Sequence, residues 1–127
     1  MQQIISTTKA PSAIGPYNQA TAFDKLLFLS GQIPLVPQTM EIIEGGVKEQ
    51  TVQVMENLKA VLEEGNSSFE NVLKTTCYLS DMDNFTAFNE IYGEYFNPQT
   101  APARSTVAVK TLPKNVLVEV DTIAFKN

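Results

Sequence analysis

Hydrophobic and polar residues alternate, or form short apolar runs, over the first third of the chain, and this pattern predicts three strands. The runs cover residues 2–6, 16–23 and 26–33. The third run is apolar at successive positions, as expected for a strand covered on both faces. Asp24 and Lys25 predict a compact turn before it, and the loop that follows contains two prolines and a Gly-Gly pair.

The period of the hydrophobic pattern changes at residue 47. Apolar or small residues then recur every three or four positions, while lysine and glutamate side chains fill the opposite side: Val47, Thr51, Val54, Met55, Leu58, Val61 and Leu62 form the apolar stripe. This spacing predicts an amphipathic helix packed on a sheet. Gly65 and Asn66 are typical of a helix C-terminus.

A strand, a second helix and two further strands are predicted beyond this helix. Residues 74–80 are rich in β-branched and aromatic side chains, which favour a strand. Asp81 and Asp83 are suited to begin the next helix, whose apolar stripe is read as core and not as a cofactor site: Met82, Phe85, Phe88, Ile91, Tyr92, Tyr95 and Phe96. The runs 101–109 and 116–124 flank a turn containing Pro113 and predict a hairpin.

The order β-β-β-α-β-α-β-β predicts a single α+β domain over residues 1–127, with one mixed sheet and two helices on one face. No linker, repeat or low-complexity segment divides the chain. The other face of the sheet then has no helix. Because the run 26–33 is too apolar to face water, we expect a partner chain to cover this face.

Composition narrows the expected partners. The net charge is −5, from 14 acidic and 9 basic side chains, which argues against nucleic acid as a partner. No apolar run approaches the ~20 residues of a membrane span, and the first residues lack the features of a signal peptide. The single cysteine, Cys77, cannot form an internal disulfide, so we expect a cytoplasmic protein with an inert buried thiol.

The chain contains no histidine, which removes histidine-based catalytic triads and histidine metal ligands from consideration. No phosphate-binding glycine loop or calcium-binding motif is present either. We therefore expect no metal and no cofactor. Any chemistry is left to arginine, glutamate, tyrosine and hydroxyl side chains, to the backbone and to water.

Arg104 is the only arginine, and it stands at the start of the first strand of the predicted hairpin. Glu119 lies in the second strand between two valines. On neighbouring strands the two side chains would form one polar site in an otherwise apolar sheet. The competing interpretation is a surface ion pair, worth ~0–1 kcal/mol.

Seven segments of the sequence resemble the RidA/YjgF family of reactive-intermediate imine deaminases. They occur in the family's order at residues 13–17, 30–34, 57–60, 102–105, 112–114, 118–120 and 123–124. The resemblance implies a chorismate-mutase-like fold and a homotrimer with its sheets facing inward and its ligand sites in clefts between subunits. It also implies hydrolysis of 2-iminobutanoate and 2-iminopropanoate, which derive from products of pyridoxal-phosphate dehydratases, to 2-oxo acids and ammonia.

The resemblance points to Arg104, Glu119 and Tyr17 as the catalytic residues. Arg104 would bind the substrate carboxylate, because its guanidinium offers a planar fork of donors. Glu119 would orient or deprotonate a water, and Tyr17 would close over the ligand. The remaining expected substrate-binding residues are Ser30, Gly31, Asn89 and Thr106.

Structural interpretations of these residues stay open. Tyr17 can be a core or interface aromatic, Ser30 and Gly31 a simple bulge, Glu119 an interface partner, and Asn89 an exposed helical residue. The segment 106–108 reads Thr-Val-Ala where many relatives have Cys-Val-Glu. Threonine at position 106 is compatible with catalytic activity only if this residue acts through its backbone and not through a thiol.

Three functions follow from the resemblance. The first is an imine deaminase. The second is a regulatory trimer that binds small 2-oxo carboxylates without turnover. The third, ribonuclease activity attributed to some relatives, is disfavoured by the negative charge and the missing histidine.

Overall fold

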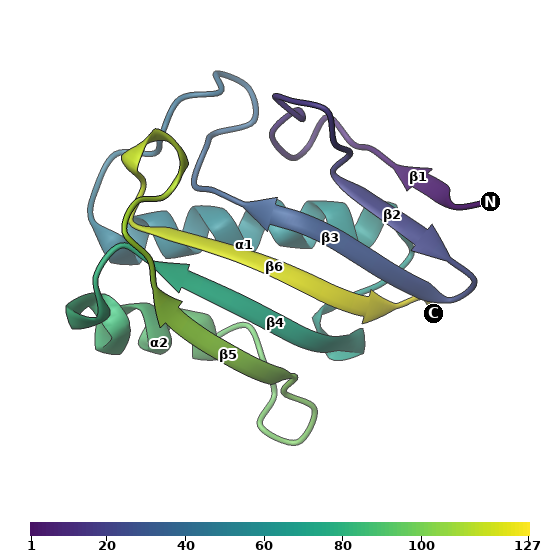
Figure 1. The fold of residues 1–127 in the computed structure, drawn as a ribbon. Helices are drawn as coiled ribbons and strands as arrows, with labels where there is room; N and C mark the ends of the chain where they lie inside the picture. Colours follow the sequence, from purple (N-terminus) through teal and green to yellow (C-terminus); the bar gives the residue numbers. More distant parts are fainter.

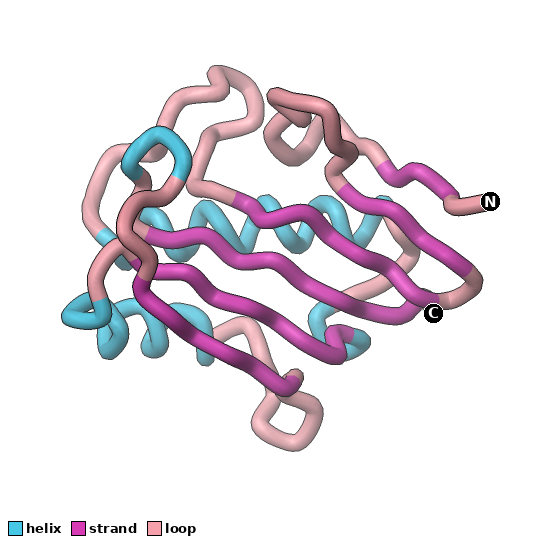
Figure 2. The backbone as a smooth tube through the Cα atoms, in the orientation of Figure 1, coloured by secondary structure: helices cyan, strands magenta, loops and turns pink.

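The computed structural model describes all 127 residues as one sheet with two main helices. Figure 1 shows the arrangement, and Figure 2 separates helices, strands and loops by colour. The order of helices and strands agrees with the prediction. In chain order they are β1 (Gln3–Ile5), β2 (Ala20–Phe23), β3 (Leu26–Gln32), α1 (Val47–Glu64), β4 (Val72–Leu79), α2 (Phe85–Gly93), β5 (Ala103–Ala108) and β6 (Val118–Phe125), with short 3₁₀ turns at Phe69–Asn71, Met82–Asn84 and Pro113–Asn115.

The six strands form one mixed sheet in the order β1-β2-β3-β6-β4-β5. All neighbouring pairs are antiparallel except β4 and β5, which are parallel. Figure 1 shows α1 behind the sheet and no helix across the near face. The predicted two-layer α+β architecture is confirmed.

The predicted hairpin of the last two strands is wrong. Strand β4 lies between β5 and β6, so that Arg104 of β5 is opposite Thr75 of β4, and Glu119 of β6 is opposite Tyr78 of β4. The segment containing α2 supplies the crossover connection that a parallel pair requires, which places β5 beside β4. After β5 the chain follows a longer loop through Pro113–Asn115 before it returns as β6.

Two element boundaries also differ from the prediction. Strand β2 begins at Ala20 and not at residue 16, because Gly15, Pro16 and Tyr17 form a tight turn in which the Tyr17 N–H donates to the Gly15 carbonyl at 2.8 Å. The second helical stripe divides into a 3₁₀ turn at Met82–Asn84 and α2. The first helix ends as expected, at Gly65 followed by Asn66 with a positive φ of 60°.

The hydrophobic core lies between the helices and one face of the sheet. Strand side chains on that face are almost fully buried, among them Leu27, Leu29, Cys77, Val118 and Val120.

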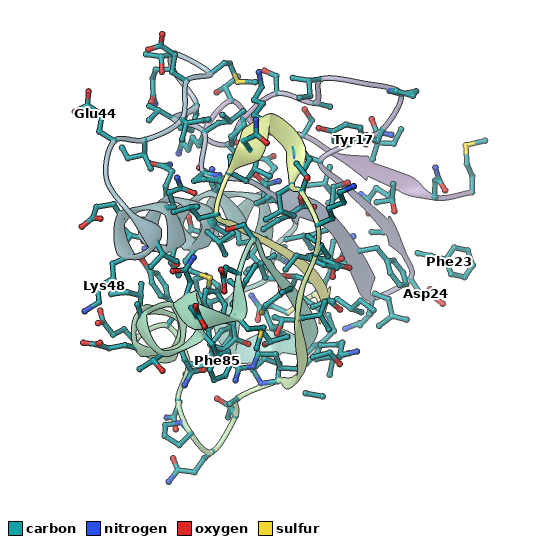
Figure 3. The ribbon with its side chains drawn as sticks, turned by 60° about the vertical axis from the view of Figure 1, so that its left-hand side comes forward. Tyr17, Phe23, Asp24, Glu44, Lys48 and Phe85 are labelled. Atoms are coloured by element: carbon teal, nitrogen blue, oxygen red, sulfur yellow. The ribbon has the colours of Figure 1, made fainter.

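The other side of the sheet, called the open face below, carries large apolar side chains that contact solvent in the single chain. Phe28 is 44% exposed and Leu26 is 41% exposed. Figure 3 shows Phe23 projecting away from the chain beside Asp24 of the β2–β3 turn. The exposed apolar side chains agree with the prediction from the run 26–33 that this face is too hydrophobic to face water.

Candidate active site in two halves

A cavity of about 370 Å³ lies at the end of β3 and brings together four of the residues singled out in the sequence. Its wall includes the loop before β2, the end of β3, the start of β6 and the turn at Pro113. We call it the Glu119 half-site, and its lining residues are Ile14, Tyr17, Ser30, Gly31, Ile33, Pro113 and Glu119. Apolar side chains therefore surround a single carboxylate.

The close approach of Gly31 and Glu119 shapes this half-site. The register between β3 and β6 shifts between Leu29 and Gln32, in agreement with the bulge that was one of the two interpretations of Ser30 and Gly31. A Cβ atom added to Gly31 would lie only 2.0 Å from Oε2 of Glu119. Glycine at this position therefore makes room for the carboxylate, as a glycine inside a strand often does for an approaching group.

The Glu119 carboxyl is half-buried, and its pKa is raised above the usual range for glutamate. Loss of solvation is the main cause, and the neighbouring charge of Asp121 adds to it. Tyr78, on the adjacent strand, donates its hydroxyl to Oδ2 of Asp121 at 3.1 Å. Glu119 is therefore a carboxylate that holds a proton more readily than an exposed one.

Tyr17 lies on the loop that precedes β2 and is neither a core residue nor part of a strand (Figure 3). Its phenol oxygen accepts a long, 3.4 Å hydrogen bond from the Ile14 N–H. Ser30 holds the same loop, because its Oγ donates to the Asn18 carbonyl at 2.6 Å. The Ser30 hydroxyl thus supports the loop that carries Tyr17.

Gln19 is a supporting residue that the sequence interpretation missed. Its buried side-chain amide donates to the carbonyls of Thr7 at 3.0 Å and Pro11 at 2.8 Å, and its Oε1 accepts from the Thr7 N–H at 2.6 Å. The loop that forms one wall of the cavity is closed by this one side chain. Gln19 lies just before β2, and the alternation of that strand gave no signal for its buried position.

Arg104 lies at the other half of the candidate site, at the start of the edge strand β5. Its Nη1 donates to Oδ1 of Asn89 on α2 at 2.7 Å. Its Cζ atom lies 4.8 Å from the ring centroid of Tyr92 and 5.5 Å from that of Phe85. Arg104 thus rests against α2 and forms no ion pair with Glu119, since the single salt bridge of the structure joins Lys48 and Glu90.

A cavity of about 490 Å³ opens beside this guanidinium. We call it the Arg104 half-site; it is lined by Asn89, Tyr92, Gly93, Phe96, Pro98, Ala101, Pro102 and Arg104. Arg104 has five N–H donors, and Asn89 accepts from one nitrogen only. The cavity therefore offers an anion several donors of fixed direction, between apolar walls.

Arg104 belongs to the helix-covered side of the sheet. Its partner across the β4–β5 ladder is Thr75, and side chains directly opposite one another share a face. The Thr75 hydroxyl shares a 2.7 Å hydrogen bond with the Tyr92 hydroxyl of α2. The guanidinium accordingly lies along α2.

Glu119 points to the open face. Its neighbours Val118 and Val120 are fully buried beneath the helices, and successive strand residues point to opposite faces. Arg104 and Glu119 are therefore separated by β4 and lie on different sides of the sheet. The expectation that one chain brings them together on neighbouring strands is wrong.

Thr106 does not present its hydroxyl to either cavity. Its Oγ1 is buried and has no hydrogen-bond partner, so any contact from this residue to a ligand is left to the backbone. Cys77, its partner across the ladder, is fully buried. Burial raises the pKa of the Cys77 thiol to about 11, which confirms the expected inert cysteine.

No helix of the structure has the length and apolar character to cross a membrane. No group of three acidic or cysteine side chains lies close enough together to hold a metal ion.

Comparisons with known proteins agree with these features. The model of the endoribonuclease L-PSP family matches residues 7–126. A RutC family protein of Synechocystis is 56% identical, with 96% of this chain and 95% of the relative aligned. A mouse protein named 2-iminobutanoate/2-iminopropanoate deaminase is 44% identical, with 99% of this chain and 93% of the relative aligned.

Solved structures show the same fold at full length. The Yersinia pestis protein YyfA, described as a member of the conserved Rid family, has a TM-score of 0.95 and 43% identity over 98% of this chain and 99% of its own. Escherichia coli TdcF, solved with bound serine, has a TM-score of 0.91 and 39% identity with the same coverage. The fold is chorismate-mutase-like, as the resemblance implied.

The family match covers nearly all of the chain, and the relatives cover it from end to end. Five of the sequence segments that suggested the RidA/YjgF family contribute residues to the two half-sites: 13–17, 30–34, 102–105, 112–114 and 118–120. The segment 57–60 lies on α1 and lines neither half-site. This chain belongs to the endoribonuclease L-PSP family, the family of the Rid and RutC proteins.

Proposed function

We propose that this protein is a 2-iminobutanoate/2-iminopropanoate deaminase that hydrolyses imines derived from products of pyridoxal-phosphate dehydratases. The observation that carries the proposal is the Arg104 guanidinium, which Asn89 and two aromatic rings hold at the wall of a cavity. A fixed planar fork of donors is suited to a small carboxylate. The deaminase name of the mouse relative supports the choice of substrate.

The complete site forms between two copies of the chain, in a homotrimer whose sheets face inward. One chain holds Arg104 and Glu119 on opposite sides of its sheet, so a single ligand meets both only if they come from different chains. The exposed Phe28 and Leu26 supply the apolar surface that such an assembly buries. The number of three chains rests on the family resemblance.

The reaction needs an electrophile, a water and a place for one proton. Arg104 binds the carboxylate, and Asn89 and the backbone of Thr106 add contacts beside it. Glu119 accepts a proton from water as the water oxygen attacks C2 of the protonated imine. That proton then moves from Glu119 to the nitrogen of the tetrahedral intermediate. As the C–N bond breaks, Glu119 takes the remaining hydroxyl proton and passes it to the departing ammonia, so that a 2-oxo acid and ammonium leave.

The remaining residues of the Glu119 half-site position the substrate. Tyr17 closes over the ligand and donates a hydrogen bond, while the backbone at Ser30 and Gly31 lines the cavity. A protonated imine is already a good electrophile, so correct placement supplies most of the rate enhancement. We propose a cytoplasmic enzyme without metal or cofactor and without a nucleic-acid or membrane partner.

A regulatory trimer that binds small carboxylates without turnover is the second candidate. The bound serine in the TdcF structure favours a role in ligand binding. A coupled assay separates the two candidates, because a dehydratase acting on threonine releases 2-oxobutanoate faster when a deaminase is added. Acceleration supports the enzyme. Tight binding of 2-oxobutanoate without acceleration supports the regulator.

Replacement of Arg104 tests the proposed role of the guanidinium. We expect Arg104→Ala to abolish the acceleration and Arg104→Lys to restore only part of it, because lysine keeps the charge and loses the fork. Lys48→Ala removes an exposed cation on α1 and serves as the matched control. Circular dichroism checks that the fold is retained, and normal turnover by a folded Arg104→Ala protein contradicts the proposal.

A further inference from the structure

The ring of Tyr92 forms the floor on which the Arg104 guanidinium rests. The Cζ of Arg104 lies 4.8 Å from the Tyr92 ring centroid, within the ~6 Å over which a cation is attracted to an aromatic face. Tyr92 is only 7% exposed, so this contact is largely shielded from water. Its position in the apolar stripe of the second helix had suggested a core residue and nothing more.

Tyr92 is itself held rigidly. Its hydroxyl shares a 2.7 Å hydrogen bond with Thr75 of β4. Its ring packs against Phe88 at a centroid distance of 5.5 Å and against Phe96 at 4.8 Å. A ring fixed on three sides is a stable platform for the flexible side chain that lies on it.

We propose that Tyr92 is a positioning residue that holds the Arg104 guanidinium in the plane required to bind the substrate carboxylate. This inference rests on the function proposed above and deepens it. The Tyr92 ring contacts the guanidinium through its face, and Asn89 accepts from Nη1 at one end. Together they fix its plane and its rotation, and they leave the remaining N–H groups for the ligand.

An arginine without such a platform loses side-chain freedom when a ligand binds, and this weakens binding. With the platform, that freedom is already lost in the free protein. Removal of the ring therefore weakens the carboxylate contact in the substrate complex and in the transition state alike. A loss of that kind raises KM and leaves kcat nearly unchanged.

Two replacements of Tyr92 separate the ring from the hydroxyl. Tyr92→Phe keeps the ring and loses the hydrogen bond to Thr75, whereas Tyr92→Leu keeps an apolar side chain and loses the ring. Tyr95→Leu is the matched control, because Tyr95 is an aromatic residue just beyond α2 that packs on Phe69 and bonds Glu56 instead of Arg104. If Tyr92→Leu does not fold, Tyr92→Met replaces it, since methionine adapts to irregular gaps.

The assembled protein is tested by two measurements, steady-state deamination of 2-iminobutanoate and calorimetric binding of 2-oxobutanoate. We expect Tyr92→Leu to raise KM and the 2-oxobutanoate Kd about 3- to 30-fold, the range of a shielded cation–π contact. We expect the kcat of Tyr92→Leu to change little, because the contact acts in the substrate complex and the transition state alike. Tyr92→Phe keeps the ring and should raise KM and Kd less than Tyr92→Leu does, whereas the control Tyr95→Leu should leave all three values within about twofold of the unchanged protein.

Equal losses in Tyr92→Phe and Tyr92→Leu, or an unchanged KM in a folded Tyr92→Leu, overturn the positioning role. If the unchanged protein binds 2-oxobutanoate without turnover, the deaminase proposal fails and the binding data still decide the role of Tyr92. If it shows neither binding nor turnover, both proposals are refuted.

Discussion

Replacement of Gly31 by alanine tests whether the position of the Glu119 carboxylate matters for catalysis. The backbone of Gly31 has no positive φ that would oppose alanine, so the added methyl group is the whole perturbation. Its Cβ would lie 2.0 Å from Oε2 of Glu119, 2.9 Å from Cδ and 3.1 Å from Cγ. The carboxylate therefore has to move by about 1 Å or more to reach an ordinary van der Waals distance.

A displacement of about 1 Å at a reacting group lowers activity by about 100-fold, which corresponds to about 2.7 kcal/mol of transition-state stabilisation. We expect this loss in kcat/KM for Gly31→Ala. The loss of folding stability should be smaller, about 1 kcal/mol, because the atoms in the way belong to the end of a flexible side chain. Activity and stability are thereby affected to different degrees.

The assay measures kcat/KM for 2-iminobutanoate and the thermal unfolding midpoint of the same preparations. Gly46→Ala is the control, since a Cβ there meets nothing closer than 3.8 Å. In a Glu119→Gln background, Gly31→Ala should add little further loss, because both changes act on the same carboxylate. Wild-type activity in a folded Gly31→Ala protein would show that the carboxylate position is not limiting.

Three further predictions concern the charge, the loop and the open face. Asp121→Asn removes a negative charge that raises the Glu119 pKa. Because Glu119 must be ionised to accept a proton, the acid limb of the pH profile of kcat/KM should move to lower pH. An acid limb at unchanged pH argues against Glu119 as the base. Gln19→Ala removes the donor to the buried carbonyls of Ala10 and Pro11 and the partner of the partly buried Thr7 backbone. It should destabilise the protein by about 1–3 kcal/mol, measured by urea unfolding at one protein concentration. Phe28→Asp places a charge on the open face, so it should convert the proposed trimer to monomers and abolish deamination, as determined by light scattering and the coupled assay. The control Val52→Asp changes a residue of α1 with a similar exposure of 41% and should leave the proposed trimer intact.

The local pattern of the sequence determined the kinds of element and their order. The spacing of apolar residues predicts α1 almost to its ends, because a helix of 3.6 residues per turn repeats its buried face within a few positions. The glycine of the run 26–33 marked the bulge, since a missing side chain inside a strand indicates a close approach. The apolar residues of that run also indicated that this face of the sheet is too hydrophobic to be left exposed to water.

Strand order and side-chain partners depended on the tertiary structure. Pairing between β4 and β5 joins residues about thirty positions apart, and no local pattern states which strand lies beside which. The insertion of β4 between β5 and β6 separates Arg104 from Glu119 and divides the candidate site into halves. The contact between Tyr92 and Arg104 likewise depends on the packing of α2 beside β5. The sequence pattern does not predict such a contact, because it forms between segments that are distant in the chain.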